Sequence, residues 1–164
     1  RGTADRLGKH IVPIDGERYH LDAPTAVAQC DENTIGVVAI LGSTLDGSYE
    51  PVGEIVAALD EFEERTGTFV PVHVDGASGA MIAPFVDPEL SWDFALARVV
   101  SINASGHKYG LVYPGVGWSH CRDRHSLPEE RIVQVHSLGG ERPTWAPNSS
   151  RPRPPVIGPC YTCW

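Results

Sequence analysis

A lysine and an aspartate are the residues of this sequence best suited to catalysis by type and position. Lys108 lies among small residues in the string S-G-H-K (105–108), and the 164-residue chain has only one other lysine. A lysine amine whose surroundings make it nucleophilic can form a Schiff base with an aldehyde. Asp75 follows an apolar run in the string H-V-D-G-A (73–77), where small neighbours would let a flat ring approach its carboxylate.

Each of these residues also has an ordinary structural interpretation. Most lysines are solvated at the surface, although Ile102 and Leu111 on either side of the loop predict partial burial of Lys108. Asp75 could simply cap a turn. His73 and Asp75 lie two residues apart, on one face of a strand, and could bind a metal ion. No third ligand is evident nearby, so we expect no metal site.

The apolar pattern predicts a parallel β-sheet that brings these residues to one edge. Residues 34–41 form a continuous β-branched run, which predicts a strand buried on both faces. A second strand is predicted at residues 69–74. Between them, Pro51 is expected to be the first helical residue and Gly67 to close the helix. Apolar residues at helical spacing form its predicted buried face: Val52, Ile55, Val56, Leu59 and Phe62.

Strand, helix and strand make a βαβ unit, which favours a parallel sheet with a right-handed crossover. Residues 98–102 predict a third strand, followed by a loop at 103–108, and residues 111–121 could contain another strand. Open α/β sheets bind ligands outside the carboxyl ends of their strands. We therefore expect Thr44, Asp75 and the loop that carries Lys108 to meet at that edge.

The requirements of pyridoxal phosphate match this combination of groups. The cofactor needs a lysine for its aldehyde, a carboxylate that keeps its ring nitrogen protonated, and donors for its phosphate. Lys108 and Asp75 supply the first two, and Ser105 and His107 could supply the third. The paired carboxylate and pyridinium make the ring an electron sink, so that a bond at the α-carbon of a substrate can break.

Longer strings are more specific than the lysine motif: C-D-E-N-T-I-G-V-V (30–38), G-S-T-L-D-G-S-Y-E (42–50), H-V-D-G-A-S-G (73–79), A-P-F-V-D-P (83–88), W-D-F (92–94) and S-I-N-A-S-G-H-K-Y-G-L-V-Y-P-G-V-G-W (101–118). They closely resemble the glutamate decarboxylases of the group II pyridoxal-phosphate-dependent decarboxylase family. The resemblance implies an α/β fold, namely part of the large domain of the aspartate-aminotransferase-like (type I) fold, with a mainly parallel sheet and flanking helices. It also implies a carboxy-lyase that converts L-glutamate to 4-aminobutyrate and CO2.

The resemblance implies a role for each matching residue. Lys108 would carry the Schiff base with pyridoxal 5′-phosphate, and Asp75 would partner the pyridine nitrogen. Ala77 would pack on one face of the ring, and Thr44 would hydrogen-bond the 3′ oxygen.

Phosphate contacts are implied as well. Ser105 and His107 resemble phosphate ligands, and Ser150 matches a serine that reaches the cofactor phosphate of a neighbouring subunit. The resemblance therefore implies a homo-oligomer whose small-molecule substrate is L-glutamate.

Departures from the family pattern lie at the two ends. Residues 1–9 do not match, and six prolines within residues 143–159 exclude a continuous helix or central strand there. We expect residues 1–164 to form an incomplete cofactor-binding large domain. It is well matched at about residues 11–122 and has a divergent, proline-rich tail at residues 123–164.

Composition excludes several classes of protein. A net charge of −8 without a basic stripe argues against nucleic-acid binding. No apolar run approaches the roughly 18–20 residues that span a bilayer, and no leader is evident. The cysteines lack the spacing of a secreted disulfide framework, and the C-x-x-C at residues 160–163 has no partner motif for zinc. We expect a soluble, cytoplasmic protein.

Two other functions stay open. The chain could be a non-catalytic piece of such an enzyme, because the strings above supply only part of a cofactor site. Alternatively, it could belong to a related amino-acid decarboxylase or lyase that uses the same cofactor on another substrate.

Overall fold

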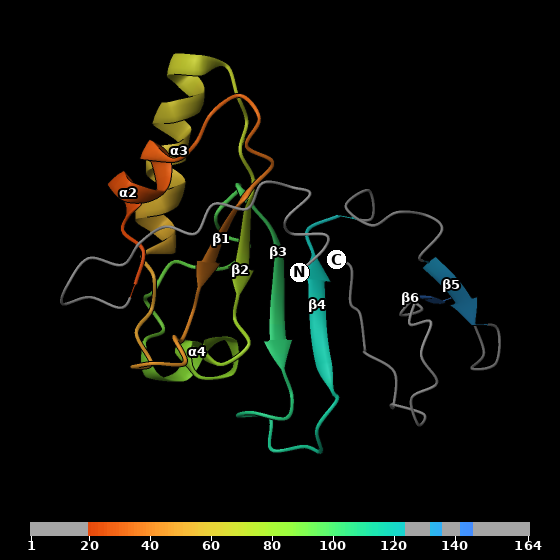
Figure 1. Cartoon of the computed structure of the whole chain (residues 1–164). Helices are drawn as coiled ribbons and strands as arrows, with labels where there is room; N and C mark the ends of the chain where they lie inside the picture. The colour runs from red at the N-terminus through yellow and green to blue at the C-terminus, as the bar shows by residue number, and fades with distance from the viewer. Residues whose placement is uncertain (1–19, 124–131, 136–141, 146–164) are drawn as a thin grey trace.

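A four-stranded sheet with helices packed against it is the centre of the structure (Figure 1). The computed structural model describes residues 20–123, together with the backbone of residues 132–135 and 142–145. No helix within these ranges is long and apolar enough to cross a membrane. In chain order the elements are α2 (Ala23–Ala28), β1 (Val37–Ile40), α3 (Val52–Thr66), β2 (Val72–Asp75), η1 (Gly79–Met81), α4 (Ala83–Val86), β3 (Val99–Ser105), β4 (Gly117–Cys121), β5 (Ile132–Val135) and β6 (Arg142–Trp145).

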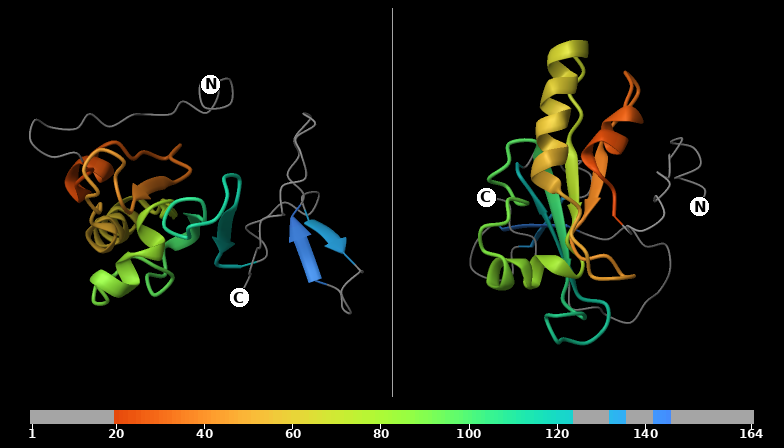
Figure 2. Two further views of the ribbon diagram at one scale, coloured as in Figure 1. Left: turned by 90° about the horizontal axis from the view of Figure 1, so that it is seen from below. Right: turned by 90° about the vertical axis from the view of Figure 1, so that its left-hand side faces the viewer.

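The strand order β1-β2-β3-β4 confirms the predicted βαβ unit and its parallel sheet. β1 pairs with β2, and β2 with β3, in parallel, whereas β4 runs antiparallel to β3. Figure 2 shows α3 and α4 on the same side of the sheet. β5 and β6 form a separate two-stranded antiparallel sheet. Among the described residues, the strand that contains Pro143 pairs only with β5, and a missing N–H is tolerated at such an edge.

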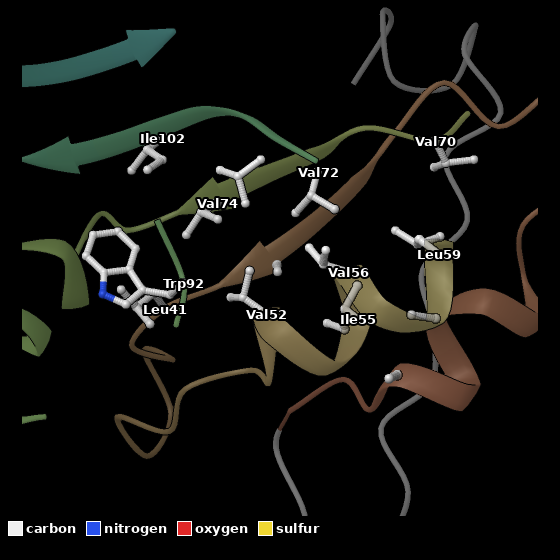
Figure 3. Packing of buried hydrophobic residues seen from close by; sticks show 14 of the residues in the cluster. Leu41, Val52, Ile55, Val56, Leu59, Val70, Val72, Val74, Trp92 and Ile102 are labelled. Carbon is white, nitrogen blue, oxygen red and sulfur yellow. The ribbon is translucent and has the colours of Figure 1, made fainter. Parts of the chain in front are cut away.

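The helix α3 forms as its apolar spacing predicts. Its buried residues are those named above, and Figure 3 shows Val52, Val56 and Leu59 on the side of the helix that faces the sheet. Gly67 ends the helix in the left-handed conformation, with φ of 74°, and its N–H bonds to the carbonyl of Glu63. Pro51 is the N-cap, one position before its predicted place. This stripe packs with buried residues of the sheet in one hydrophobic cluster.

The expectation that the first strand is buried on both faces is wrong for the described part of the chain. Ala39 is fully buried beneath α3, but Val38 on the opposite face is 56% exposed and Ile40 is 39% exposed. The strand alternates because α3 covers only one face of β1. A continuous apolar run indicates a strand with two apolar faces, and it does not show what covers the second face.

The third strand is longer than predicted, and the fourth is shorter. β3 continues through Ser105, so the expected loop begins only at Gly106. β4 begins at Gly117, whereas Leu111 has a φ of 55°, which a strand cannot accommodate. The register of β2 and β3 shifts between Val72 and His73, so that one extra residue of β3 bulges there.

A buried arginine joins α3 to the start of β3. Arg98 is 4% exposed and donates to Asp60 and Glu63 on α3 and to the carbonyl of Val70. Its guanidinium also lies 4.7 Å from the centre of the Phe69 ring. Burial opposes the charge, but hydrogen bonds donated to the carboxylates of Glu63 and Asp60, together with their negative charges, outweigh it and raise the pKa of Arg98. These bonds tie the helix to the β2–β3 pair.

Candidate active site

The carboxyl ends of β1, β2 and β3 form one edge, here called the carboxyl edge and defined by Ile40, Asp75 and Ser105. Ile40 lies beside Asp75 in the sheet, and Asp75 lies beside Asn103. The backbone N–H of Leu41 donates to the carbonyl of Asp75 at 2.9 Å, which extends the pairing beyond β1. The loop after each strand therefore starts at the same edge.

A tight turn after β2 packs against the end of β1. The N–H of Gly79 donates to the carbonyl of Leu41 at 2.8 Å. A Cβ at Gly79 would lie 2.4 Å from that oxygen, so only glycine fits. Gly42, with a φ of 93°, turns the chain after β1, and a Cβ there would lie 3.1 Å from the Cβ of Ser78. The Thr44 loop thus starts against the turn that follows Asp75.

Asp75 uses one carboxylate oxygen within the protein. Its Oδ1 accepts hydrogen bonds from the N–H of Ala77 at 3.1 Å and from Nδ2 of Asn103 at 2.9 Å. The bond from Ala77 is the turn cap that the sequence allowed. Within the described residues, no hydrogen bond engages Oδ2. One oxygen therefore orients the carboxylate, and the other is left to accept a proton donor.

Lys108 extends back over the same turn. Its Nζ donates to Oγ of Ser78 at 3.1 Å, and its N–H bonds to the carbonyl of Ser105 at 3.3 Å. The N–H of Ser105 in turn bonds to the carbonyl of Ala77 at 3.2 Å. The structure thus brings the lysine and the aspartate to the two ends of one short turn, residues 75–78.

The prediction that Lys108 is partly buried is wrong. The lysine is exposed, and Leu111, which was expected to shield it, is 90% exposed. The reason is that the loop between β3 and β4 extends beyond the sheet, as Figure 1 shows. Contact with Ser78 rather than an apolar enclosure therefore holds the amine here.

The other predicted site residues make no hydrogen bond to the turn at residues 75–78 within the described part of the chain. His107 is exposed, and its Nδ1–H donates to the carbonyl of Val116 at 3.1 Å. Thr44 lies exposed in the turn after β1. Ser150 lies outside the described residues, as do both cysteines of the C-x-x-C.

Residue-by-residue reading of the sequence missed a polar row behind Asp75. Ser101, His73 and Asn103 form hydrogen bonds in series, at 2.7 Å and 2.9 Å, and Asn103 reaches Asp75. The available signal was that His73 lies two residues before Asp75 on a strand, and Ser101 two residues before Asn103. The bulge in β3 hid their alignment.

The metal-binding alternative for His73 and Asp75 gains no support. Both ring nitrogens of His73 are engaged by side chains of β3. Among the described residues, no group of three His, Cys, Asp or Glu side chains is arranged to hold a metal ion.

Comparison with known families decides the assignment of the chain. Residues 3–156 match the pyridoxal-dependent decarboxylase conserved domain. The chain belongs to the pyridoxal-dependent decarboxylase family. The resemblance inferred from its motifs is confirmed over most of its length.

Individual relatives within the pyridoxal-dependent decarboxylase family point to one branch. The chain is 49% identical over 150 residues to glutamate decarboxylases of Aliivibrio fischeri and Lactococcus lactis, which covers 92% of this chain and 32% of each relative. It is 48% identical over 155 residues to glutamate decarboxylase beta of Listeria monocytogenes. The chain therefore spans about a third of the length of the curated relatives that it matches.

Solved structures agree with this assignment. A Lactobacillus brevis glutamate decarboxylase superposes with a TM-score of 0.76 at 47% identity, over 85% of this chain and 32% of the other. A Burkholderia pseudomallei sphingosine-1-phosphate lyase superposes with a TM-score of 0.62 at 27% identity, over 87% and 33%. The predicted fold class is confirmed: the mixed sheet and its flanking helices have the aspartate-aminotransferase-like fold.

Proposed function

We propose that this chain is part of a glutamate decarboxylase, which uses pyridoxal 5′-phosphate to convert L-glutamate to 4-aminobutyrate and CO2. Identities of 47–49% to glutamate decarboxylases support the substrate. The observation that carries the chemistry is the convergence of Lys108 and Asp75 on one turn, where Nζ of the lysine bonds to Ser78 and the carboxylate bonds to Ala77.

The groups at the carboxyl edge fit this cofactor. An amine and a carboxylate lie at the two ends of the turn formed by residues 75–78, and one carboxylate oxygen has no hydrogen bond from the described part of the chain. Hydroxyl groups of Thr44 and Ser105 lie on the neighbouring loop and strand end. A ring nitrogen that carries a proton needs an acceptor, and an aldehyde needs an amine. The donor and acceptor types present match those needs.

Lys108 and Asp75 have the two central roles in the proposal. The amine of Lys108 anchors the cofactor through its aldehyde, and the exposure of this loop gives the aldehyde access. Asp75 accepts a hydrogen bond from the protonated ring nitrogen through Oδ2, because Oδ1 already accepts from two donors. When bound, pyridoxal phosphate supplies a ring that accepts the electron pair left at the α-carbon after CO2 departs.

The supporting roles are proposed from the resemblance to the family. Ala77 packs against the ring; its N–H donates to Asp75 and its carbonyl accepts from the N–H of Ser105. Thr44 bonds to the 3′ oxygen from the loop after β1. Ser105 and His107 bind phosphate beside the first turn of the lysine loop. Ser150 is proposed, from its sequence match alone, to reach a neighbouring subunit's phosphate.

The wider organisation is also part of the proposal. The chain is an incomplete large domain of a cytoplasmic homo-oligomer, well matched at about residues 11–122, with a divergent, proline-rich tail at residues 123–164. Coverage of about a third of each relative supports the incomplete domain. Gel filtration with light scattering of the protein that carries this chain tests the oligomer.

Trapping the cofactor tests the proposed function. Pyridoxal phosphate is added to the protein that carries this chain, the visible band is recorded, and borohydride then fixes any Schiff base. We expect the band to disappear and peptide mass spectrometry to find the reduced adduct on Lys108. With L-glutamate as substrate, 4-aminobutyrate and CO2 should form in equal amounts. An adduct elsewhere, or none, contradicts the proposal.

A related lyase with another substrate is the second candidate. The fold similarity to sphingosine-1-phosphate lyase favours keeping it, although identity is lower there, at 27%. Turnover of a panel of amino acids separates the two, because this alternative predicts the Lys108 adduct without decarboxylation of glutamate. A non-catalytic piece predicts neither.

A further inference from the structure

Four polar side chains share one face of the sheet behind the proposed cofactor site. His73 lies beside Ser101, and Asp75 lies beside Asn103, in the register of β2 and β3. The bulge at the start of this pairing places His73 beside Ser101 and Asp75 beside Asn103. It resets the alternation of β3, so that Val99 and Ile102 are buried while Ser101 and Asn103 lie on the other face.

With a neutral imidazole at His73, the hydrogen bonds in this row run in one direction. An ionised carboxylate only accepts, so the amide nitrogen of Asn103 faces Asp75, as the 2.9 Å contact shows. Oδ1 of Asn103 then faces His73 and must accept from Nε2–H. Neutral His73 is therefore the Nε2–H tautomer, and its Nδ1 accepts the hydroxyl proton of Ser101 at 2.7 Å.

We propose that His73 and Asn103 are positioning residues that, with Ser101, form a relay of hydrogen bonds directed at Oδ1 of Asp75. The relay starts at a hydroxyl, passes through the imidazole and the amide, and ends at the carboxylate. Each donor polarises the next, so the last bond is stronger than an isolated amide bond. The relay proposal extends the proposed function, and it rests on that function for the role of Asp75.

The consequence of the relay is a fixed carboxylate plane. Asn103 and the N–H of Ala77 hold the same oxygen of Asp75 from β3 and from the turn. Rotation about χ2 would break both bonds, so Oδ2 stays directed away from them. A base or acceptor held in this way is preorganised for one partner, here the ring nitrogen of the cofactor.

The first test needs no cofactor. Nitrogen-15 NMR of histidine-labelled protein, with the His73 signal assigned by its loss in His73→Gln, reads the tautomer directly. We expect Nε2–H for His73 and a shift of its Nε2 signal in Asn103→Ala. The matched control Asn33→Ala, at an exposed position whose side chain makes no hydrogen bond within the described residues, should leave the signal in place. An Nδ1–H tautomer in the unaltered protein overturns the relay, whether or not Asn103→Ala folds.

The second test reads the cofactor and turnover in the protein that carries this chain. Asn103→Ala and His73→Phe should each lower kcat about tenfold while KM for glutamate changes less than twofold. Both should shift the ring signal of nitrogen-15-labelled pyridoxal phosphate. His73→Gln should restore both readouts, because an amide can accept from Ser101 and donate to Asn103.

The two proposals fail in different ways. Absence of a Lys108 adduct removes the proposed function, while the tautomer still decides the relay. An adduct with unaltered kcat and ring signal in Asn103→Ala overturns the relay and leaves the proposed function standing. Thermal unfolding of each variant shows whether a loss of activity is a loss of fold.

Discussion

Nζ of Lys108 donates a hydrogen bond to Oγ of Ser78 at 3.1 Å, and the two residues are 30 positions apart in the chain. Ser78 lies three residues after Asp75, in a turn held against β1 by Gly79. This one contact therefore connects the lysine loop, the aspartate and the ends of the central strands. The hydrogen bond to Ser78 explains why the amine of Lys108 has a defined position although its loop is exposed.

Replacing Lys108 should abolish cofactor attachment. In Lys108→Ala no amine remains at the turn, so added pyridoxal phosphate should give no band that borohydride can fix, and glutamate turnover should be lost essentially completely. Absorption spectra and a 4-aminobutyrate assay measure the two effects. The control is Lys9→Ala, since Lys9 is the other lysine of the chain. Substantial turnover in Lys108→Ala would remove the assignment.

Ser78 should control how fast the lysine reacts. The hydroxyl holds the amine over the turn, and Ser78→Ala removes a charge-assisted hydrogen bond worth about 1 kcal/mol at an exposed position. We expect formation of the visible band to slow about fivefold, by stopped-flow absorption, with the final amplitude retained. Ser91→Ala, at an exposed serine, is the matched control. Equal rates in both variants would show that Ser78 does not hold the amine.

Local pattern predicted the helix well, and the carboxyl ends of the first two strands to within one residue. The apolar spacing from Val52 to Phe62 defined the buried face of α3, and Gly67 defined its end. These features depend on the periodicity of a single segment, and that periodicity is visible in the sequence. The placement of Thr44, Asp75 and Lys108 on consecutive loops also follows from strand order alone.

Features that depend on pairing between segments were not predictable in the same way. Whether the face of β1 that carries Val38 is buried depends on the segments that pack against it, and the sequence of β1 alone does not predict them. The row from Ser101 to Asp75 depends on a one-residue bulge between two strands. Without it, His73 would lie beside Val100. A shift of one residue reverses which side chains share a face, so the row appears only once the register is known.

The turn behind the site should be intolerant of a methyl group. In Gly79→Ala the new Cβ would lie 2.4 Å from the carbonyl oxygen of Leu41, which also accepts the hydrogen bond from residue 79. Relief requires movement of two backbones, so we expect the free energy of unfolding to fall by at least about 2 kcal/mol. Urea unfolding followed by circular dichroism measures this change.

Gly53→Ala in α3 is the matched control for the turn. A Cβ at Gly53 meets the carbonyl of Ser91 at 3.5 Å, an ordinary contact. Alanine also favours a helix over glycine, so we expect a gain of about 0.5 kcal/mol from the same substitution. Equal losses in both variants would contradict the role given to the turn.

Cys30 should make stability depend on pH in the alkaline range. Burial raises the pKa of this thiol above its ordinary value of 9.0, and the charge of Asp31 adds to the shift, against a hydrogen bond with Thr34. The protonated thiol also donates to the carbonyl of Ala26 at 3.4 Å. As pH rises through 9.0, the unfolded chain loses this proton before the folded chain does. The free energy of unfolding should therefore fall as pH rises above 9.0.

Alkylation separates this effect from other alkaline changes, because only the thiolate reacts with iodoacetamide. At pH 8 the Cys30 peptide should be modified more slowly in the folded protein than in urea, as peptide mass spectrometry resolves. Cys30→Ala should flatten the fall in unfolding free energy above pH 9.0 and leave the neutral range nearly unchanged. Equal alkylation rates in folded and unfolded protein would mean that the thiol is not protected, and the fall in stability would then need another group.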